Sequence, residues 1–215
     1  MMLVTSCSSI PNNLQRFKEA NGELTSPKPN EDRVVFMGNS ITEGWGNLRP
    51  EFFAGKPYVN RGISGETTPQ MLTRFKQDVV RLEPAVVVIL AGINDIAGNT
   101  GPTTIEAIVE NIVSMIEMAN KNDIKVVLCA VLPANKFPWQ PSLKPAEKVV
   151  ELNILLKDYA TTNELEYVDF YAPMVDDDAG LQLALGEDGV HPNVDGYLIM
   201  EPLLEAALAR ALARQ

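Results

Sequence analysis

The chain has 215 residues, of which 46% are hydrophobic and 21% are charged, and its formal net charge is −10, from 18 basic and 28 acidic residues. This composition is typical of a globular protein with a sizeable core and argues against an intrinsically disordered chain. The acidic balance and the lack of a Lys/Arg cluster in the sequence argue against a nucleic-acid partner.

The two cysteines lie far apart, and no disulfide framework or zinc spacing can be built from them. Cys129 falls inside an apolar run at residues 126–131, so we expect it in the core. Val4-Thr5-Ser6-Cys7 resembles the lipobox of bacterial lipoproteins, although the apolar stretch that normally precedes it is missing. Two interpretations stay open: a bacterial protein exported to the periplasm or anchored by lipid on Cys7, and a cytoplasmic protein with a chance match. No segment reaches the ~20 apolar residues of a membrane span.

The N-terminal residues differ in composition from the rest. Residues 8–30 are rich in Ser, Pro, Asn and Lys, apart from a short helical stretch at Leu14–Ala20. We therefore expect residues 1–30 to be a lead-in and residues 31–215 to form a single domain. Short apolar runs in that domain predict five strands, at residues 33–37, 58–62, 85–91, 125–131 and 166–169. Helices are expected from Ser40 onward and over residues 67–82, 102–118, 145–161 and 198–212.

Strands that alternate with helices indicate parallel β-α-β units, whose right-handed crossovers place helices on both faces of one sheet. The predicted fold is α/β, a flavodoxin-like three-layer α/β/α sandwich around a central parallel sheet of about five strands. In such sheets the reactive groups gather outside the carboxyl ends of the strands. Three predicted strands end in a glycine followed by polar residues, at residues 38–40, 62–64 and 92–95, so we expect these tips to meet in one crevice.

Ser40 stands where the first strand gives way to a helix. The free N–H groups of a helix N-terminus would face any anion formed beside its hydroxyl, an arrangement that suits acyl transfer. The alternative interpretation is that Ser40 caps the helix.

His191 is the only histidine in the chain. A lone histidine is often a structural or surface residue. The Asp188-x-x-His191 spacing, however, allows the carboxylate to fold back on the imidazole ring, fix its tautomer and stabilise its protonated form. This spacing favours a role for His191 as a catalytic base.

These segments carry a family resemblance. Gly38-Asn39-Ser40-Ile41-Thr42, then Gly62, then Gly92-x-Asn94-Asp95, then Asp188-x-x-His191-Pro192 resemble, in order and spacing, the four motif blocks of the SGNH hydrolases, also called GDSL-like esterases and lipases. The blocks frame the chain from about residue 34 to residue 197, and four blocks in the same order form a specific signal.

The resemblance implies a serine esterase that needs neither metal nor cofactor. It implies that Ser40 is the nucleophile, His191 the general base and then acid, and Asp188 its orienting partner. It also implies an oxyanion hole made by the N–H groups of Ser40 and Gly62 and by the side chain of Asn94. The chemistry agrees, because serine needs a base and the developing oxyanion needs fixed donors.

The sequence departs from the family pattern at one position. Asn39 stands where the family usually has an aspartate, which the resemblance implies is a structural group rather than a member of the triad. Asn keeps the hydrogen-bonding reach of Asp and loses its charge.

Similar members of the family include the catalytic subunit type of platelet-activating-factor acetylhydrolase and bacterial carbohydrate acetylesterases. We therefore expect a small-molecule or carbohydrate ester as substrate, with a short acyl group, above all acetyl. Trp45 and Trp139 are candidates for lining the cleft, and packing is the alternative for both. A mixed polar rim suited to sugar hydroxyls is expected from Glu43, Asn47, Arg49, Glu66, Asn99, Asn135, Lys136 and Gln140.

Two other functions stay open. One is a short-acyl hydrolase of lipids or phospholipids. The other is a flavodoxin-like binding module, in which residues 38–44 would cradle the phosphate of a nucleotide at a helix N-terminus. Homo-oligomerisation is also left open.

Overall fold

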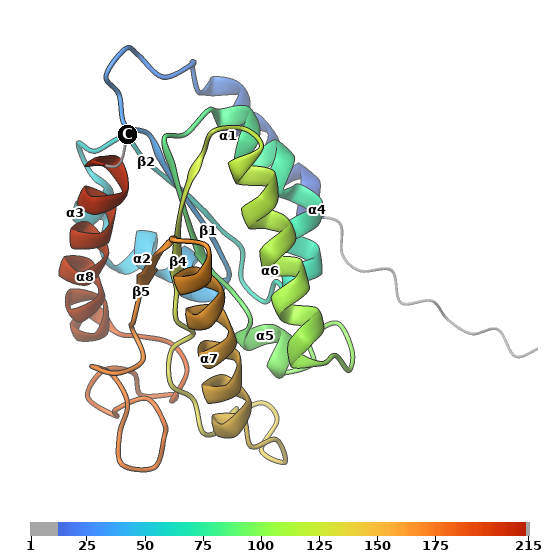
Figure 1. The fold of residues 1–215 in the computed structure, drawn as a ribbon. Coiled ribbons are helices and arrows are strands. Elements are labelled where there is room, and N and C mark those ends of the chain that lie inside the picture. Colours follow the sequence, from blue (N-terminus) through green and yellow to red (C-terminus); the bar gives the residue numbers. More distant parts are fainter. Residues whose placement is uncertain (1–12, 214–215) are drawn as a thin grey trace, which may run out of the picture.

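The computed structural model of the chain describes residues 13–213 and shows a five-stranded sheet with helices packed on both of its faces (Figure 1). The strand order is β2-β1-β3-β4-β5, and every neighbouring pair is parallel. The predicted α/β/α sandwich is confirmed. The strands are β1 (Val34–Gly38), β2 (Tyr58–Gly62), β3 (Val86–Leu90), β4 (Lys125–Cys129) and β5 (Glu166–Val168).

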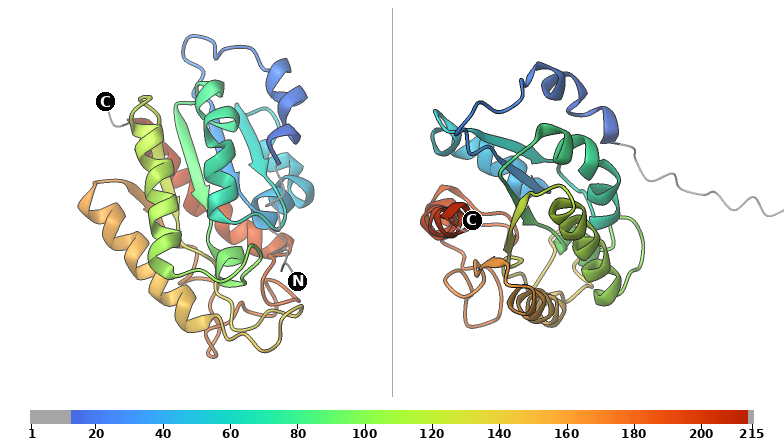
Figure 2. Two further views of the ribbon diagram at one scale, coloured as in Figure 1. Left: turned by 90° about the vertical axis from the view of Figure 1, so that its right-hand side faces the viewer. Right: turned by 45° about the horizontal axis from the view of Figure 1, so that its top comes forward.

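Two layers of helices cover the sheet (Figures 1 and 2). One face carries α2 (Ser40–Leu48), α3 (Pro50–Phe53) and α8 (Val194–Ala213). The other face carries α4 (Thr68–Asp78), α6 (Ile105–Asn120) and α7 (Ala146–Thr162). The short elements are η1 (Asn13–Gln15), α1 (Lys18–Glu23), η2 (Val80–Leu82) and α5 (Ile93–Ile96).

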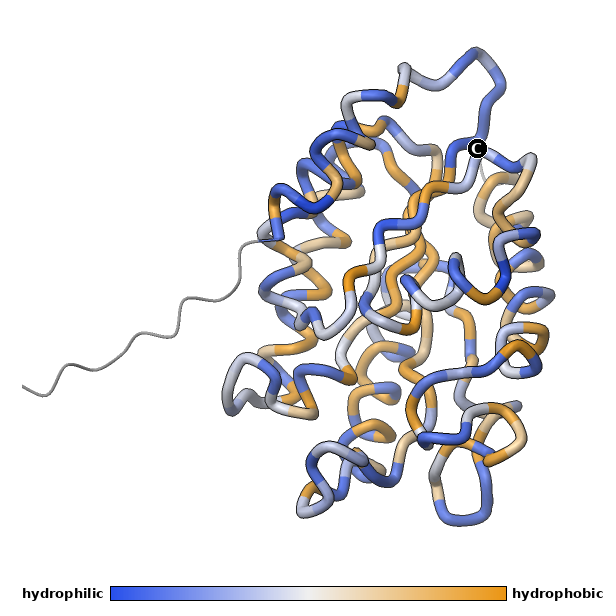
Figure 3. Tube along the Cα trace, turned by 180° about the vertical axis from the view of Figure 1, so that it is seen from behind, coloured by the Kyte–Doolittle hydropathy of each residue, from blue (hydrophilic) through white to orange (hydrophobic). Residues whose placement is uncertain are grey.

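The core lies in and around the central strands. All residues of β1 and β3 are buried, because both strands have a neighbour on each side and helices above and below. These strands stand out as hydrophobic in Figure 3, whereas hydrophilic residues predominate in many of the outer loops. Cys129 is buried in the same core, as predicted, and burial raises the pKa of its thiol.

The last helix begins earlier than its apolar pattern suggests. The sequence predicts a helix over 198–212, and α8 starts at Val194. Asn193 explains the difference, because its side-chain oxygen accepts a hydrogen bond from the Gly196 N–H at 3.1 Å and its carbonyl accepts one from Tyr197 N–H at 3.1 Å. The residue after the His191-Pro192 pair therefore caps the helix.

The described part of the N-terminal lead-in is docked on α4. Gln77 donates from Nε2 to the Leu14 carbonyl at 2.6 Å, and Asn21 donates from Nδ2 to Asp78 Oδ1 at 2.7 Å. Cys7 lies outside the described residues. Among residues 13–213 we find no helix whose length and hydropathy would suit a membrane span.

Candidate active site

Ser40 is the first residue of α2 and follows directly on the end of β1. Asn39 is the N-cap of this helix, and its Oδ1 accepts a hydrogen bond from the Ile41 N–H at 3.0 Å. The buried Asn39 side chain thus performs the capping role for which Asp would also serve, without a charge. Because Ser40 lies in the first turn, its own N–H has no partner within the helix and is available to a ligand.

Ser40, His191 and Asp188 form a continuous chain of hydrogen bonds. The Ser40 Oγ lies 2.9 Å from His191 Nε2, and His191 Nδ1 lies 2.6 Å from Asp188 Oδ2. The three residues come from the end of β1 and from the loop that leads into α8, 151 positions apart in the sequence. This is the geometry in which a base can take a proton from a nucleophile while a carboxylate orients the base.

Hydrogen bonds favour the charged form of the Asp188 carboxylate. Burial by itself raises its pKa, but bonds from the His191 N–H, the His191 ring and the Val190 N–H outweigh burial and hold the pKa of Asp188 below its usual value. Both backbone N–H groups donate to Oδ1 at 2.8 Å, which leaves Oδ2 for the ring. The lowered pKa keeps Asp188 an anion, whose Oδ2 can accept a hydrogen bond from the His191 ring.

Asn94 lies in α5, the short helix that follows β3, and its side chain is buried. Its Nδ2 donates one hydrogen bond to the Glu66 carbonyl at 2.9 Å. An amide has a second N–H on the same nitrogen, which can serve a bound oxyanion. Its neighbour Asp95 accepts hydrogen bonds from the Thr68 N–H and hydroxyl. Asp95 thereby ties α5 to the start of α4.

Gly62 does not have the role that the sequence suggests. Its N–H donates to Asn60 Oδ1 at 2.9 Å, so this donor is already used beside the strand. A Cβ at Gly62 would lie 2.2 Å from the backbone nitrogen of Glu43. The glycine is required there because β2 and α2 approach each other closely, and we correct its assignment from oxyanion donor to packing residue.

Gly65, a second glycine in the same loop, is not singled out by the motif pattern. Gly65 is exposed, and its φ of +79° is a conformation that favours glycine. Its carbonyl accepts a hydrogen bond from Asn99 Nδ2 at 3.0 Å, and we find no acceptor for its N–H within residues 13–213. The useful signal in the sequence was the second glycine of Gly62-Ile63-Ser64-Gly65, which lies beyond the strand and so can turn its N–H outward.

The two tryptophans have different surroundings. Trp45 is only 1% exposed and stacks on Phe52 and Tyr197, at centroid distances of 5.2 and 5.4 Å. It therefore packs in the core beneath α8 and cannot contact a substrate, which corrects its assignment to the cleft. Trp139 is 50% exposed, and its ring lies 6.1 Å from the ring of His191.

Three residues of the expected rim, Glu66, Arg49 and Glu43, form ion pairs, the last with Arg16 at 3.3 Å. Glu66 is 1% exposed and pairs with Arg74 at 2.6 Å, so it does not belong to the rim. Arg49 pairs with Glu201 at 2.9 Å. The described residues hold no group of three or more His, Cys, Asp or Glu side chains placed to bind a metal ion.

Comparison with known proteins shows the family. The profile of the GDSL-like Lipase/Acylhydrolase family matches residues 36–199. A proposed acylhydrolase of Bacteroides fragilis is 50% identical, with a TM-score of 0.92, and the match covers 94% of this chain and 98% of that one. A GDSL-like lipase of Bacteroides thetaiotaomicron is 46% identical, with a TM-score of 0.91 and coverage of 94% and 99%.

An acetylxylan esterase of Xylanibacter ruminicola is 28% identical over 221 residues. The match covers 85% of this chain and 44% of the esterase, so the chain spans less than half the length of that relative.

Proposed function

Because the chain belongs to the GDSL-like lipase/acylhydrolase family, we propose that it is a serine esterase in which Ser40, His191 and Asp188 form the catalytic triad. The observation that carries this proposal is the hydrogen-bonded chain from Ser40 Oγ through the His191 ring to Asp188. The phosphate-binding alternative for residues 38–44 is not favoured, because it leaves the contact between Ser40 and His191 without a purpose.

The reaction proceeds in two steps on Ser40. The Ser40 Oγ attacks the acyl carbon while its proton passes to His191 Nε2. The ester C–O bond then breaks, and His191 returns that proton to the departing alcohol, which leaves an acyl group on Ser40. Water attacks this acyl-enzyme, giving one proton to His191, and the acid departs as Ser40 Oγ recovers the proton.

Three donors would stabilise the oxyanion of each tetrahedral intermediate. They are the N–H of Ser40, the N–H of Gly65 and the Nδ2 of Asn94. Gly65 takes the place that the sequence had suggested for Gly62, because its N–H is the one without a partner in this loop. Losing one such donor typically costs about 100-fold to 1,000-fold in rate.

The test is hydrolysis of p-nitrophenyl acetate by the wild-type protein and by Ser40→Ala and His191→Ala. We expect each substitution to remove nearly all activity, by roughly a million-fold in kcat, since members of a triad act as one unit. Circular dichroism should show an unchanged fold. A Ser40→Ala protein that retains most of its activity would overturn the mechanism.

We further propose that the substrates are short-chain esters, above all acetyl esters of carbohydrate alcohols. The relative named acetylxylan esterase supports this, as does the exposed face of Trp139, which stacks on Phe137 at 5.3 Å and lies beside His191. An aromatic face held in this way offers a platform for a sugar ring.

The acyl and alcohol preferences can be measured separately. We expect kcat/KM to fall from p-nitrophenyl acetate through butyrate to octanoate, and acetate to be released from acetylated xylose or glucose. Trp139→Ala should lower kcat/KM about tenfold on the acetylated sugars through KM, with little change on p-nitrophenyl acetate. Faster turnover of octanoate, with the sugars untouched, would favour a lipid ester instead.

A further inference from the structure

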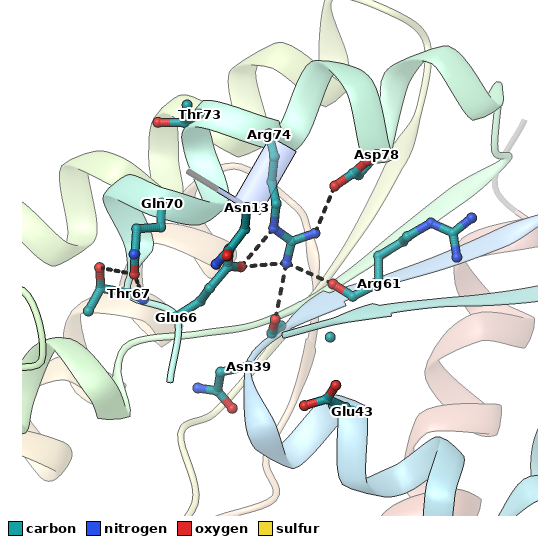
Figure 4. Close-up of polar contacts among 12 residues, drawn as sticks. Asn13, Asn39, Glu43, Arg61, Glu66, Thr67, Gln70, Thr73, Arg74 and Asp78 are labelled. Carbon is teal, nitrogen blue, oxygen red and sulfur yellow. Dashed lines mark hydrogen bonds and ion pairs between the residues drawn. The ribbon is translucent and has the colours of Figure 1, made fainter. Parts of the chain in front are cut away.

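A buried ion network around Arg74 and Glu66 lies at the ends of β1 and β2 (Figure 4). Its centre is Arg74 of α4, which is 1% exposed. The guanidinium pairs with Glu66 Oε2 at 2.6 Å and with Asp78 Oδ2 at 3.2 Å. It also donates to the Arg61 carbonyl at 2.8 Å and to the Gly38 carbonyl at 3.3 Å. Arg74 therefore links the ends of β1 and β2, the two strands whose tips carry Ser40 and Gly65.

Glu66 connects this network to two of the proposed oxyanion donors. Its carbonyl accepts the hydrogen bond from Asn94 Nδ2 at 2.9 Å, and it follows Gly65 directly in the chain. Its carboxylate is held by Arg74 through Oε2 and by Asn13 Nδ2 through Oε1, at 2.8 Å. Glu66 thus fixes the backbone next to the Gly65 N–H and the orientation of the Asn94 side chain.

Stability alone does not account for a buried ion pair at this position. The cost of desolvating both charges largely offsets their attraction, and apolar replacements of buried pairs are often neutral or stabilising. Fixed donors, in contrast, are essential to an oxyanion hole, because hydrogen bonds must be aligned before the charge develops. The ion pair between Glu66 and Arg74 is therefore better explained by a role in holding the oxyanion donors in place than by a contribution to the stability of the fold.

We propose that Glu66, clamped by Arg74 and by Asn13 of the N-terminal segment, is a positioning residue for the oxyanion hole. This inference rests on the proposed esterase function. It also gives the N-terminal segment a role, because Asn13 reaches across 53 positions of sequence to support the loop that carries Gly65.

The two carboxylates that flank Arg74 provide a matched pair of variants. Glu66→Gln and Asp78→Asn each remove one charge from the same guanidinium, and both residues are buried. Only Glu66 contacts an oxyanion donor. We expect Glu66→Gln to lower kcat on p-nitrophenyl acetate about tenfold with KM within about threefold, and Asp78→Asn to leave kcat within about threefold, at comparable losses of thermal midpoint.

A double-mutant cycle with Asn94 distinguishes a positioning effect of Glu66 on this donor from a general loss of stability. If Glu66 acts through Asn94, Glu66→Gln should change kcat less than about threefold in an Asn94→Ala background, since coupled residues are not additive. Equal kcat for Glu66→Gln and Asp78→Asn would overturn the inference, and a full tenfold loss in the Asn94→Ala background would overturn the part of it that runs through Asn94. The proposed function is checked separately in the same assay, by comparing the activity of the wild type with that of Ser40→Ala.

A milder pair covers the case in which the buried variants do not fold. Asn13→Ala removes the bond to Glu66, and Asn21→Ala removes a bond from the same segment to Asp78 together with the one that Asn21 Oδ1 accepts from Arg61. We expect a roughly threefold lower kcat for Asn13→Ala only, although the thermal midpoint of Asn21→Ala should fall at least as much as that of Asn13→Ala. Identical kcat values for the two variants would contradict the inference.

Discussion

At the scale of single residues, Asp188 and His191 of the proposed triad form one local unit. The Asp188 side chain folds back toward the residues that follow it, and its two oxygens accept hydrogen bonds from different groups. Oδ1 accepts the N–H groups of Val190 and His191, and Oδ2 accepts the ring. The loop thereby orients the His191 ring before substrate binds, and Ser40 is the only member that must be brought from elsewhere in the fold.

This division of tasks predicts the effect of Asp188→Asn. The amide oxygen can still accept the two backbone N–H groups, but its NH2 then faces His191 Nδ1 and favours the tautomer that cannot take the Ser40 proton. We expect kcat to fall by about 1,000-fold to 10,000-fold, less than for Ser40→Ala, with an unchanged thermal midpoint.

A matched control is available for this substitution. Asp176 Oδ1 also accepts two backbone N–H groups, from Asp178 and Gly180, but bonds to no histidine. Asp176→Asn should leave kcat within about twofold. A loss of activity equal to that of Asp188→Asn would mean that turn geometry, rather than the tautomer, is responsible.

The parts of the site that could be predicted are those whose side chains carry chemistry. Ser40, Asn94, Asp188 and His191 follow strand ends or share a short turn, so topology brings them to one edge of the sheet. The free N–H of Gly65 could not be predicted in the same way. Nearly every residue type carries a backbone N–H, so the sequence offers only the glycines as candidates for a donor. This loop contains two of them, Gly62 and Gly65.

At the scale of elements, the continuous apolar runs located the central strands to within one or two residues at each end. These strands are buried on both faces, so every position is apolar and the pattern is strong. The docking of the N-terminal segment could not be read from the sequence, because it depends on single polar contacts such as that of Asn21 with Asp78, 57 positions apart. The surroundings of Trp45 were missed for the same reason, since they involve α8.

At the scale of the whole molecule, the buried carboxylate of Asp95 joins α5 to the start of α4, and Thr68 of α4 is bonded in turn to α6. Both oxygens of Asp95 lie 3.0 Å from the Thr68 N–H of α4, and Asn111 of α6 donates to the Thr68 hydroxyl at 3.2 Å. Burial raises the pKa of Asp95 from 3.8 to about 6, although the bonds from Thr68 oppose this. The free energy of folding must therefore depend on the protonation of this residue.

The sign of that dependence follows from the raised pKa. The folded protein binds the Asp95 proton more tightly than the unfolded chain does, so this contribution to stability is fully present below the unfolded pKa. It is lost as the pH rises to and through about 6. The gap of roughly two pH units corresponds to about 3 kcal/mol.

Asp95→Asn removes the ionisation and keeps an oxygen for the Thr68 N–H. We expect the unfolding free energy of the wild type, relative to that of Asp95→Asn, to fall by about 3 kcal/mol between about pH 4 and pH 7 in urea titrations. Glu147→Gln on the exposed side of α7 is the control, and its difference from the wild type should vary by less than about 0.5 kcal/mol. The difference in unfolding free energy between wild type and Asp95→Asn could instead stay constant with pH. The Asp95 carboxylate would then ionise as readily in the folded protein as in the unfolded chain, and its burial would not raise its pKa.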